Sequence, residues 1–187
     1  MGTYKRGEKN MKGTKFVTYT AVMLALLVAV QAITAPFGQL VTGSLVNFIL
    51  IAACILVDWK SGLIIAVLSP FIAKLFGIGP AFLLFIPIVS IGNASLVGIY
   101  SLSKVKAIKI NQTVKRAIAV VLSAVVKYLV LSIGIGKIAV MFINIPEQKI
   151  QMITKMFGIT QLFTALIGGV LAIVLIPLIS YAVKHNK

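Results

Sequence analysis

Long apolar stretches follow one another along almost the whole chain, and short breaks containing polar residues, glycine or proline separate them. A helix that spans a membrane needs about 20 predominantly apolar residues. The stretches approach or reach this length, although the second and third are short. The pattern therefore predicts an all-α membrane protein, built as a bundle of six transmembrane helices. We expect these helices at residues 16–34, 44–57, 63–76, 81–102, 117–135 and 157–183.

The breaks between the apolar stretches predict where the helices end. Pro36, Gly38 and Gly43 indicate a loop after the first helix, and residues 58–62 indicate a tight polar turn after the second. Residues 136–154 mix polar and apolar positions, contain Pro146, Glu147 and Lys149, and fall between the expected fifth and sixth helices.

The composition supports a membrane protein over a soluble one. Of the 187 residues, 60% are hydrophobic, and the mean hydropathy is +1.09. Soluble domains are about 45–50% apolar, and a domain of this size must keep much of its surface in water. We expect a basic N-terminal segment over residues 1–15, a six-helix domain over 16–183 and a basic tail over 184–187.

The distribution of charge predicts the orientation in the membrane. The chain carries 18 Lys and Arg against 3 Asp and Glu, a net charge of +15. With six spans, 13 of these basic residues fall on the side of the two termini and 4 on the other side, while Lys127 lies inside the fifth span. Because positive loops stay in the cytoplasm, both termini are predicted to be cytoplasmic. The expected location is the cell membrane, namely the plasma membrane of a bacterium. The sequence has no basic face interleaved with aromatic residues, so nothing in it suggests nucleic-acid binding.

Catalysis has little support in this sequence. The acids are Glu8, Asp58 and Glu147, and the histidine is His185 in the tail. These residues form no carboxylate pair, metal cluster or nucleophile–base arrangement within the predicted bundle. We therefore expect neither an enzyme nor a bound cofactor or metal. Gly136-Lys137 lacks the remainder of a nucleotide-binding loop, so uphill transport would need energy from elsewhere.

Lys127 is the leading candidate for ligand binding. A lysine in the middle of a span is costly, and it usually faces a cavity or a partner. The alternative is a side chain that reaches the membrane interface, which would need a long reach here. Ser123 lies one turn earlier on the same face. Because no acid in the bundle can neutralise Lys127, an anionic or carbonyl-bearing ligand is the natural counterpart.

Other polar residues within or beside the spans are candidates for the rest of the site. Gln161 and Thr164 share one face of the last helix with Gly168, and they would bind either a ligand or a neighbouring helix. The glycine pair 168–169 is expected to permit tight helix packing. Asn47 in the second span and Asn93 in the fourth have the same two possibilities, and Gln39 lies in the predicted first loop. The expected binding residues are Lys127, Ser123, Asn93, Gln161, Thr164 and Gln39.

A row of alanines follows one face of the first helix. Ala21, Ala25 and Ala29 recur every four residues, and small side chains let another helix approach closely. The row would serve packing within the bundle or the docking of a separate membrane protein.

Together, these features resemble the substrate-binding S component of energy-coupling factor (ECF) vitamin transporters. The resemblance covers about Lys15 to Val183 and rests on the size, the six spans with basic cytoplasmic loops, the alanine row and the stretch Gln161-Leu-x-Thr-Ala-x-x-Gly-Gly169. It implies high-affinity binding of a small water-soluble vitamin or related metabolite near the outer face, beneath the loops after the first and fifth helices. It also implies uptake by toppling of the subunit, with the alanine row docked on a transmembrane coupling protein that carries two ATPases. A small secondary transporter or channel, acting alone as a homo-oligomer, is the alternative.

The charge distribution makes a testable prediction about topology. Single cysteines at Lys106 and Gln148, in a Cys54→Ala background, are expected to react from the cytoplasmic and the outer side respectively, because the positive loops stay inside. Labelling with a membrane-impermeant thiol reagent in intact and in opened cells distinguishes the two sides. Labelling of both positions from one side would contradict the six-span topology.

Overall fold

The computed structural model describes residues 2–80, 82–104, 111–139, 141–142 and 146–185, and every regular element in these ranges is helical. Six long helices and one short one follow in order. Their bounds are α1 Gly2–Thr34, α2 Gln39–Leu56, α3 Trp59–Leu75, α4 Phe85–Ser101, α5 Gln112–Ile133, α6 Glu147–Phe157 and α7 Ile159–His185. Short 3-10 turns follow α1 (Ala35–Phe37) and α4 (Leu102–Lys104), and a π-helical turn, Gly134–Ala139, continues α5. The predicted all-α bundle is confirmed.

Several helices are long and apolar enough to cross a membrane. Within the described residues these are Gly13–Phe37, Gln39–Leu56, Gln112–Lys137 and Lys149–Leu178, while α4 is apolar but slightly shorter. The chain is therefore a multi-pass membrane protein. The N-terminal part of α1 lies inside the predicted basic segment 1–15, so helix and segment overlap.

Three local predictions are wrong, each for a physical reason. Gly43 lies inside α2, where its missing side chain admits another helix instead of making a loop. Only the beginning of the predicted turn at 58–62 lies outside a helix. The Asp58 side chain accepts a hydrogen bond from Lys60 N at 2.9 Å and caps α3, which begins at the next residue. The mixed stretch 136–154 includes most of α6, whose Ile150 and Ile153 pack against a small apolar cluster with Phe85 and Leu131.

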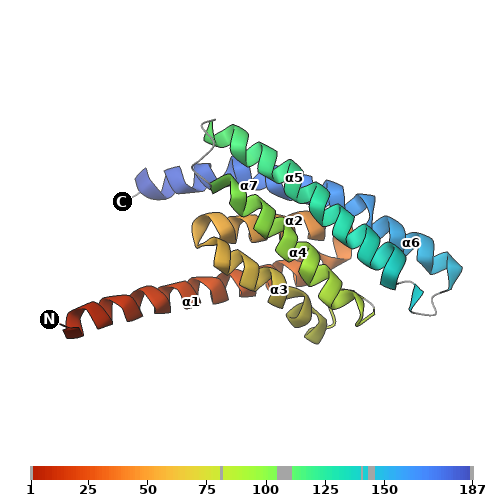
Figure 1. The fold of residues 1–187 in the computed structure, drawn as a ribbon, viewed down its shortest axis with the longest axis horizontal. Coiled ribbons are helices and arrows are strands. Elements are labelled where there is room, and N and C mark those ends of the chain that lie inside the picture. Colours follow the sequence, from red (N-terminus) through yellow and green to blue (C-terminus); the bar gives the residue numbers. More distant parts are fainter. Residues whose placement is uncertain (1, 81, 105–110, 140, 143–145, 186–187) are drawn as a thin grey trace.

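The arrangement of the helices places both ends of the chain at one end of the bundle, whereas α6 lies at the opposite end (Figure 1). An even number of spans requires this. α7 packs most extensively against α2 and also against α5, and α4 lies between α3 and α5. α1 lies at the edge and contacts α2 and α3.

Two adjacent glycines set how closely α7 approaches its neighbours. A Cβ atom on Gly168 would lie 2.5 Å from Ser44 O and 2.7 Å from Asn47 Cβ on α2. A Cβ atom on Gly169 would overlap the Val120 side chain on α5. The glycine pair therefore lets α7 pack tightly against both helices, as the sequence predicted.

The half of the bundle that lies towards the chain ends is a packed apolar core. Most of its members lie in the later parts of α2, α4 and α7, in the earlier part of α5 and in the first half of α3. The fully buried side chains include Ala53, Cys54, Ile65, Val97 and Ala172. Buried polar side chains in this half include Thr20 and Ser61, and the Thr20 hydroxyl donates to Ser61 Oγ at 2.9 Å.

The close contact at Gly168 makes a prediction about stability. Gly168→Ala is expected to destabilise the protein by about 1–3 kcal/mol, because the new methyl group would overlap the backbone of α2. Gly98→Ala on α4 is the matched control, since no atom lies within 4 Å of the position that its new methyl group would take; it is expected to be neutral or to stabilise by about 0.5–1 kcal/mol. Thermal unfolding in detergent measures both. Equal stability of the two variants would show that α7 does not depend on this contact.

Candidate functional site

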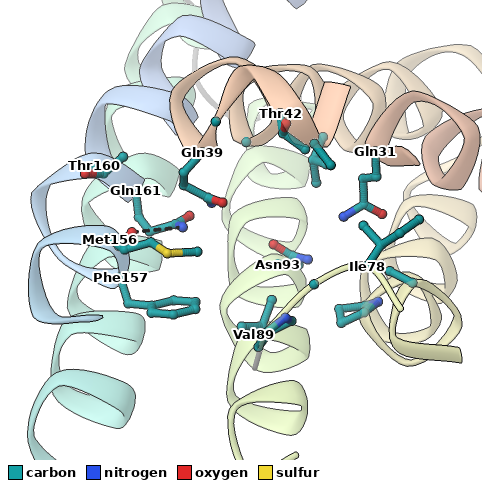
Figure 2. A pocket seen from close by; sticks show the side chains of 18 of the residues that line it. Gln31, Gln39, Thr42, Ile78, Val89, Asn93, Met156, Phe157, Thr160 and Gln161 are labelled. Carbon is teal, nitrogen blue, oxygen red and sulfur yellow. Dashed lines mark hydrogen bonds between the residues drawn. The ribbon is translucent and has the colours of Figure 1, made fainter. Parts of the chain in front are cut away.

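A cavity of about 450 Å³ lies in the half of the bundle away from the chain ends. Its walls come from the C-terminal parts of α1 and α3, the N-terminal parts of α2 and α4, the middle of α5, and the α6–α7 junction. Ligand cavities in proteins range from about 300 to 1,000 Å³. Polar side chains reach it from separate helices, as Figure 2 shows for several of them: Gln31, Gln39, Thr42, Asn93, Thr160 and Gln161.

Lys127 is held at the cavity by two asparagine side chains. Its ammonium donates to Asn47 Oδ1 at 2.6 Å and to Asn93 Oδ1 at 2.7 Å. Lys127 is 3% exposed, so the ammonium does not extend to the membrane interface. Asn47, which is fully buried, and Asn93, which is 3% exposed, come from α2 and α4. The contact therefore joins three helices at one buried positive charge.

The ammonium fixes the orientation of both amides. An ammonium group has no acceptor, so each asparagine must present its oxygen to Lys127 and its nitrogen elsewhere. Asn47 Nδ2 donates to Thr164 Oγ1 at 3.3 Å, and Thr164 Oγ1 donates to Gln161 O at 3.1 Å. A buried chain of hydrogen bonds thus extends from α5 through α2 to α7.

The short helix α6 covers one side of the cavity. Met156 and Phe157 line the wall, and the Phe157 ring packs edge-on against Phe85 with 5.6 Å between ring centroids. Gln161 Nε2 donates to Met156 O at 3.3 Å and links α6 to α7. A Cβ atom on Gly158 would lie 2.5 Å from Thr154 O, so only glycine permits this tight junction.

The charge of the described lining residues has one sign. Lys127 and the exposed Lys155 are among them, whereas no Asp or Glu is. The described residues also contain no group of three His, Cys, Asp or Glu side chains that would hold a metal ion. The cavity therefore suits a molecule that brings acceptors or negative charge.

The predicted site residues separate into two groups. Lys127, Asn93, Gln161 and Gln39 line the cavity; Gln39 does so from the first turn of α2 and not from a loop. Thr164 lies behind the lining in the hydrogen-bonded chain, as described above.

Ser123 is placed outside the lining, although it shares a face with Lys127. It is 1% exposed, and it donates to Val120 O at 3.0 Å within its own helix. The serine hydroxyl satisfies the backbone of α5.

Asn47, which contacts Lys127 directly, is not among the binding residues expected from the sequence. Its signal in the sequence is an amide inside an apolar span, the same as that of Asn93. Which amide meets Lys127 depends on the register between α2 and α5, and the sequence pattern does not reveal it. Gln31, near the end of α1, also reaches the cavity.

The alanine row of α1 faces away from the bundle. Ala21, Ala25 and Ala29 are exposed, while Leu27 points inward and is fully buried. Only 11% of the most apolar window of α1 is buried. The row therefore does not serve packing within this bundle.

Comparisons with models of known protein families, with curated proteins and with solved structures gave no significant match.

Proposed function

We propose that this protein binds a small water-soluble metabolite, of the vitamin type, and takes it up across the cell membrane as the substrate-binding S component of an ECF-type transporter. The observation that carries the proposal is the cavity of about 450 Å³ with Lys127 at its wall. A buried ionisable residue within the membrane-spanning part of a bundle marks a functional site by default. The acceptor that best complements its charge is a carboxylate or a strong carbonyl group.

The position of the cavity supports uptake. Its lining residues lie in the half of the bundle away from both chain ends, and the charge distribution predicts that those ends are cytoplasmic. The cavity therefore faces the outer side. A water-soluble molecule from outside would reach Gln31, Gln39 and Lys127 without crossing the apolar core.

The packed core favours a binding subunit over a channel. Along α2 and α4, the residues one or two turns beyond Asn47 and Asn93 are the fully buried Leu50, Cys54 and Val97. These buried side chains lie between the cavity and the chain ends, an arrangement that favours a binding subunit over an open pore. The proposed function therefore includes a partner that completes transport.

The exposed face of α1 is the proposed docking surface for that partner. Ala21, Ala25 and Ala29 present a smooth strip to the outside of the bundle, and small residues allow close helix packing in a membrane. The proposed partner is a transmembrane coupling protein joined to two ATPases, because the chain itself has no nucleotide-binding loop.

Substitution of Lys127 tests the binding site. Lys127→Met keeps an unbranched apolar side chain but removes the charge, and it is expected to weaken binding of the molecule that copurifies with the protein by about tenfold to a hundredfold. Isothermal titration in detergent measures the affinity. Lys137→Met is the control, since Lys137 is exposed and outside the lining. Unchanged affinity in a folded Lys127→Met protein would remove Lys127 from the site.

Substitution in the alanine row tests the docking surface. Ala25→Leu is expected to reduce copurification of ATPase subunits and cellular uptake, because a bulky side chain prevents close helix contact. Binding of the copurified molecule should stay unchanged. Ala117→Leu is the control, since Ala117 is also exposed but lies on α5. Full assembly and uptake with leucine at both Ala21 and Ala25 would contradict docking through α1.

A further inference from the structure

The hydrogen bonds around Lys127 leave unused N–H donors on two groups, the Lys127 ammonium and the Asn93 amide nitrogen. An ammonium group has three N–H donors, and two of them are used by Asn47 and Asn93. Because Asn93 Oδ1 must face the ammonium, Asn93 Nδ2 points elsewhere. Within the described part of the chain, it donates to no acceptor. Both residues line the cavity.

The amide of Asn93 is directed into the cavity. In Figure 2 its side chain points into the space between Gln39 and Gln31. Asn47, in contrast, is fully buried behind the lining and uses its nitrogen for Thr164. Both asparagines therefore accept a hydrogen bond from Lys127. They differ in that Asn93, among the described residues, has a free amide nitrogen to donate to a bound molecule, whereas the nitrogen of Asn47 is used by Thr164.

We infer that Asn93 Nδ2 and the third N–H of Lys127 together bind the two oxygens of a carboxylate, so that the transported molecule is a carboxylic acid. This inference rests on the proposed function and narrows its ligand class. Two neighbouring donors match a group with two oxygens. A neutral carbonyl offers one oxygen and leaves the charge of Lys127 uncompensated, whereas hydrogen bonds to an ionised acceptor are roughly twice as strong as neutral ones.

The other walls of the cavity describe the body of the acid. Ile78, Val89, Met156 and Phe157 form apolar surface around the polar end. A phosphate ester fits less well, since it carries more charge and the described lining contains no arginine for bidentate contacts. We therefore expect a carboxylic acid whose body has polar groups as well as apolar surface, since Gln31, Gln39 and Gln161 also line the cavity.

Two aspartate variants separate the roles of the asparagines. Asn93→Asp retains the shape and the contact with Lys127, but it replaces the donor in the cavity with a second anion. Asn47→Asp puts the same charge against Lys127 from behind the lining and leaves Asn93 Nδ2 in place. For a bound carboxylic acid, we expect about a hundredfold loss of affinity in Asn93→Asp and about tenfold in Asn47→Asp. Thermal unfolding in detergent verifies that both variants fold.

The experiment uses an aqueous metabolite extract as the probe. The purified full-length protein captures molecules from the extract, and mass spectrometry identifies what is released on denaturation. The captured molecule is then titrated as the free acid and as its primary amide, and the amide is expected to bind at least about tenfold more weakly.

The outcomes distinguish this inference from the proposed function. Capture of nothing would overturn the proposed function. Capture of a molecule without a carboxylate, including a phosphate ester, would overturn the inference and leave the proposed binding function standing. Equal losses of affinity in Asn93→Asp and Asn47→Asp would remove Asn93 from the contact with the ligand.

Discussion

The structure depends on the contact between one buried ammonium and two amide oxygens. Lys127 has no carboxylate partner among the described residues, and a buried charge without hydrogen bonds is strongly unfavourable. Asn47 and Asn93 supply these bonds at 2.6 and 2.7 Å. Because the three residues belong to α5, α2 and α4, the solvation of one charge fixes the relative positions of three helices. The same contact decides which polar atoms face the cavity.

Small residues make this contact possible. The hydrogen bond from Asn47 to Thr164 requires that α2 and α7 come close, and Gly43 and Gly168 lie at that interface. In a membrane, helices are drawn together by packing and hydrogen bonds more than by the exclusion of apolar surface. The glycines and the polar chain are therefore parts of one arrangement, in which close packing places the amides and the amides reinforce the packing.

The fold could largely be predicted from the sequence, because the lengths of apolar stretches reflect membrane thickness. The errors occurred where one residue type serves two purposes. Glycine is typical of turns, but Gly43 lies inside α2 and serves helix packing. The helix α6 is too polar and too short to be recognised in the sequence as a membrane span. For the site, a lysine inside an apolar span was sufficient to single out Lys127. The sequence did not distinguish Asn47 from Asn93, or Ser123 from a lining residue, because those roles depend on the rotation of each helix about its axis.

The position of the packed core also bears on permeability. Buried apolar side chains, among them Leu50, Cys54 and Val97, lie between the cavity and the chain ends, so under the proposed function a molecule bound by an isolated copy would leave by the side from which it entered. Such a copy reaches equilibrium with one side of the membrane alone. If the proposed function holds, such a copy would be present in excess over its energy-supplying partner without dissipating ion gradients or allowing accumulated metabolites to leak out.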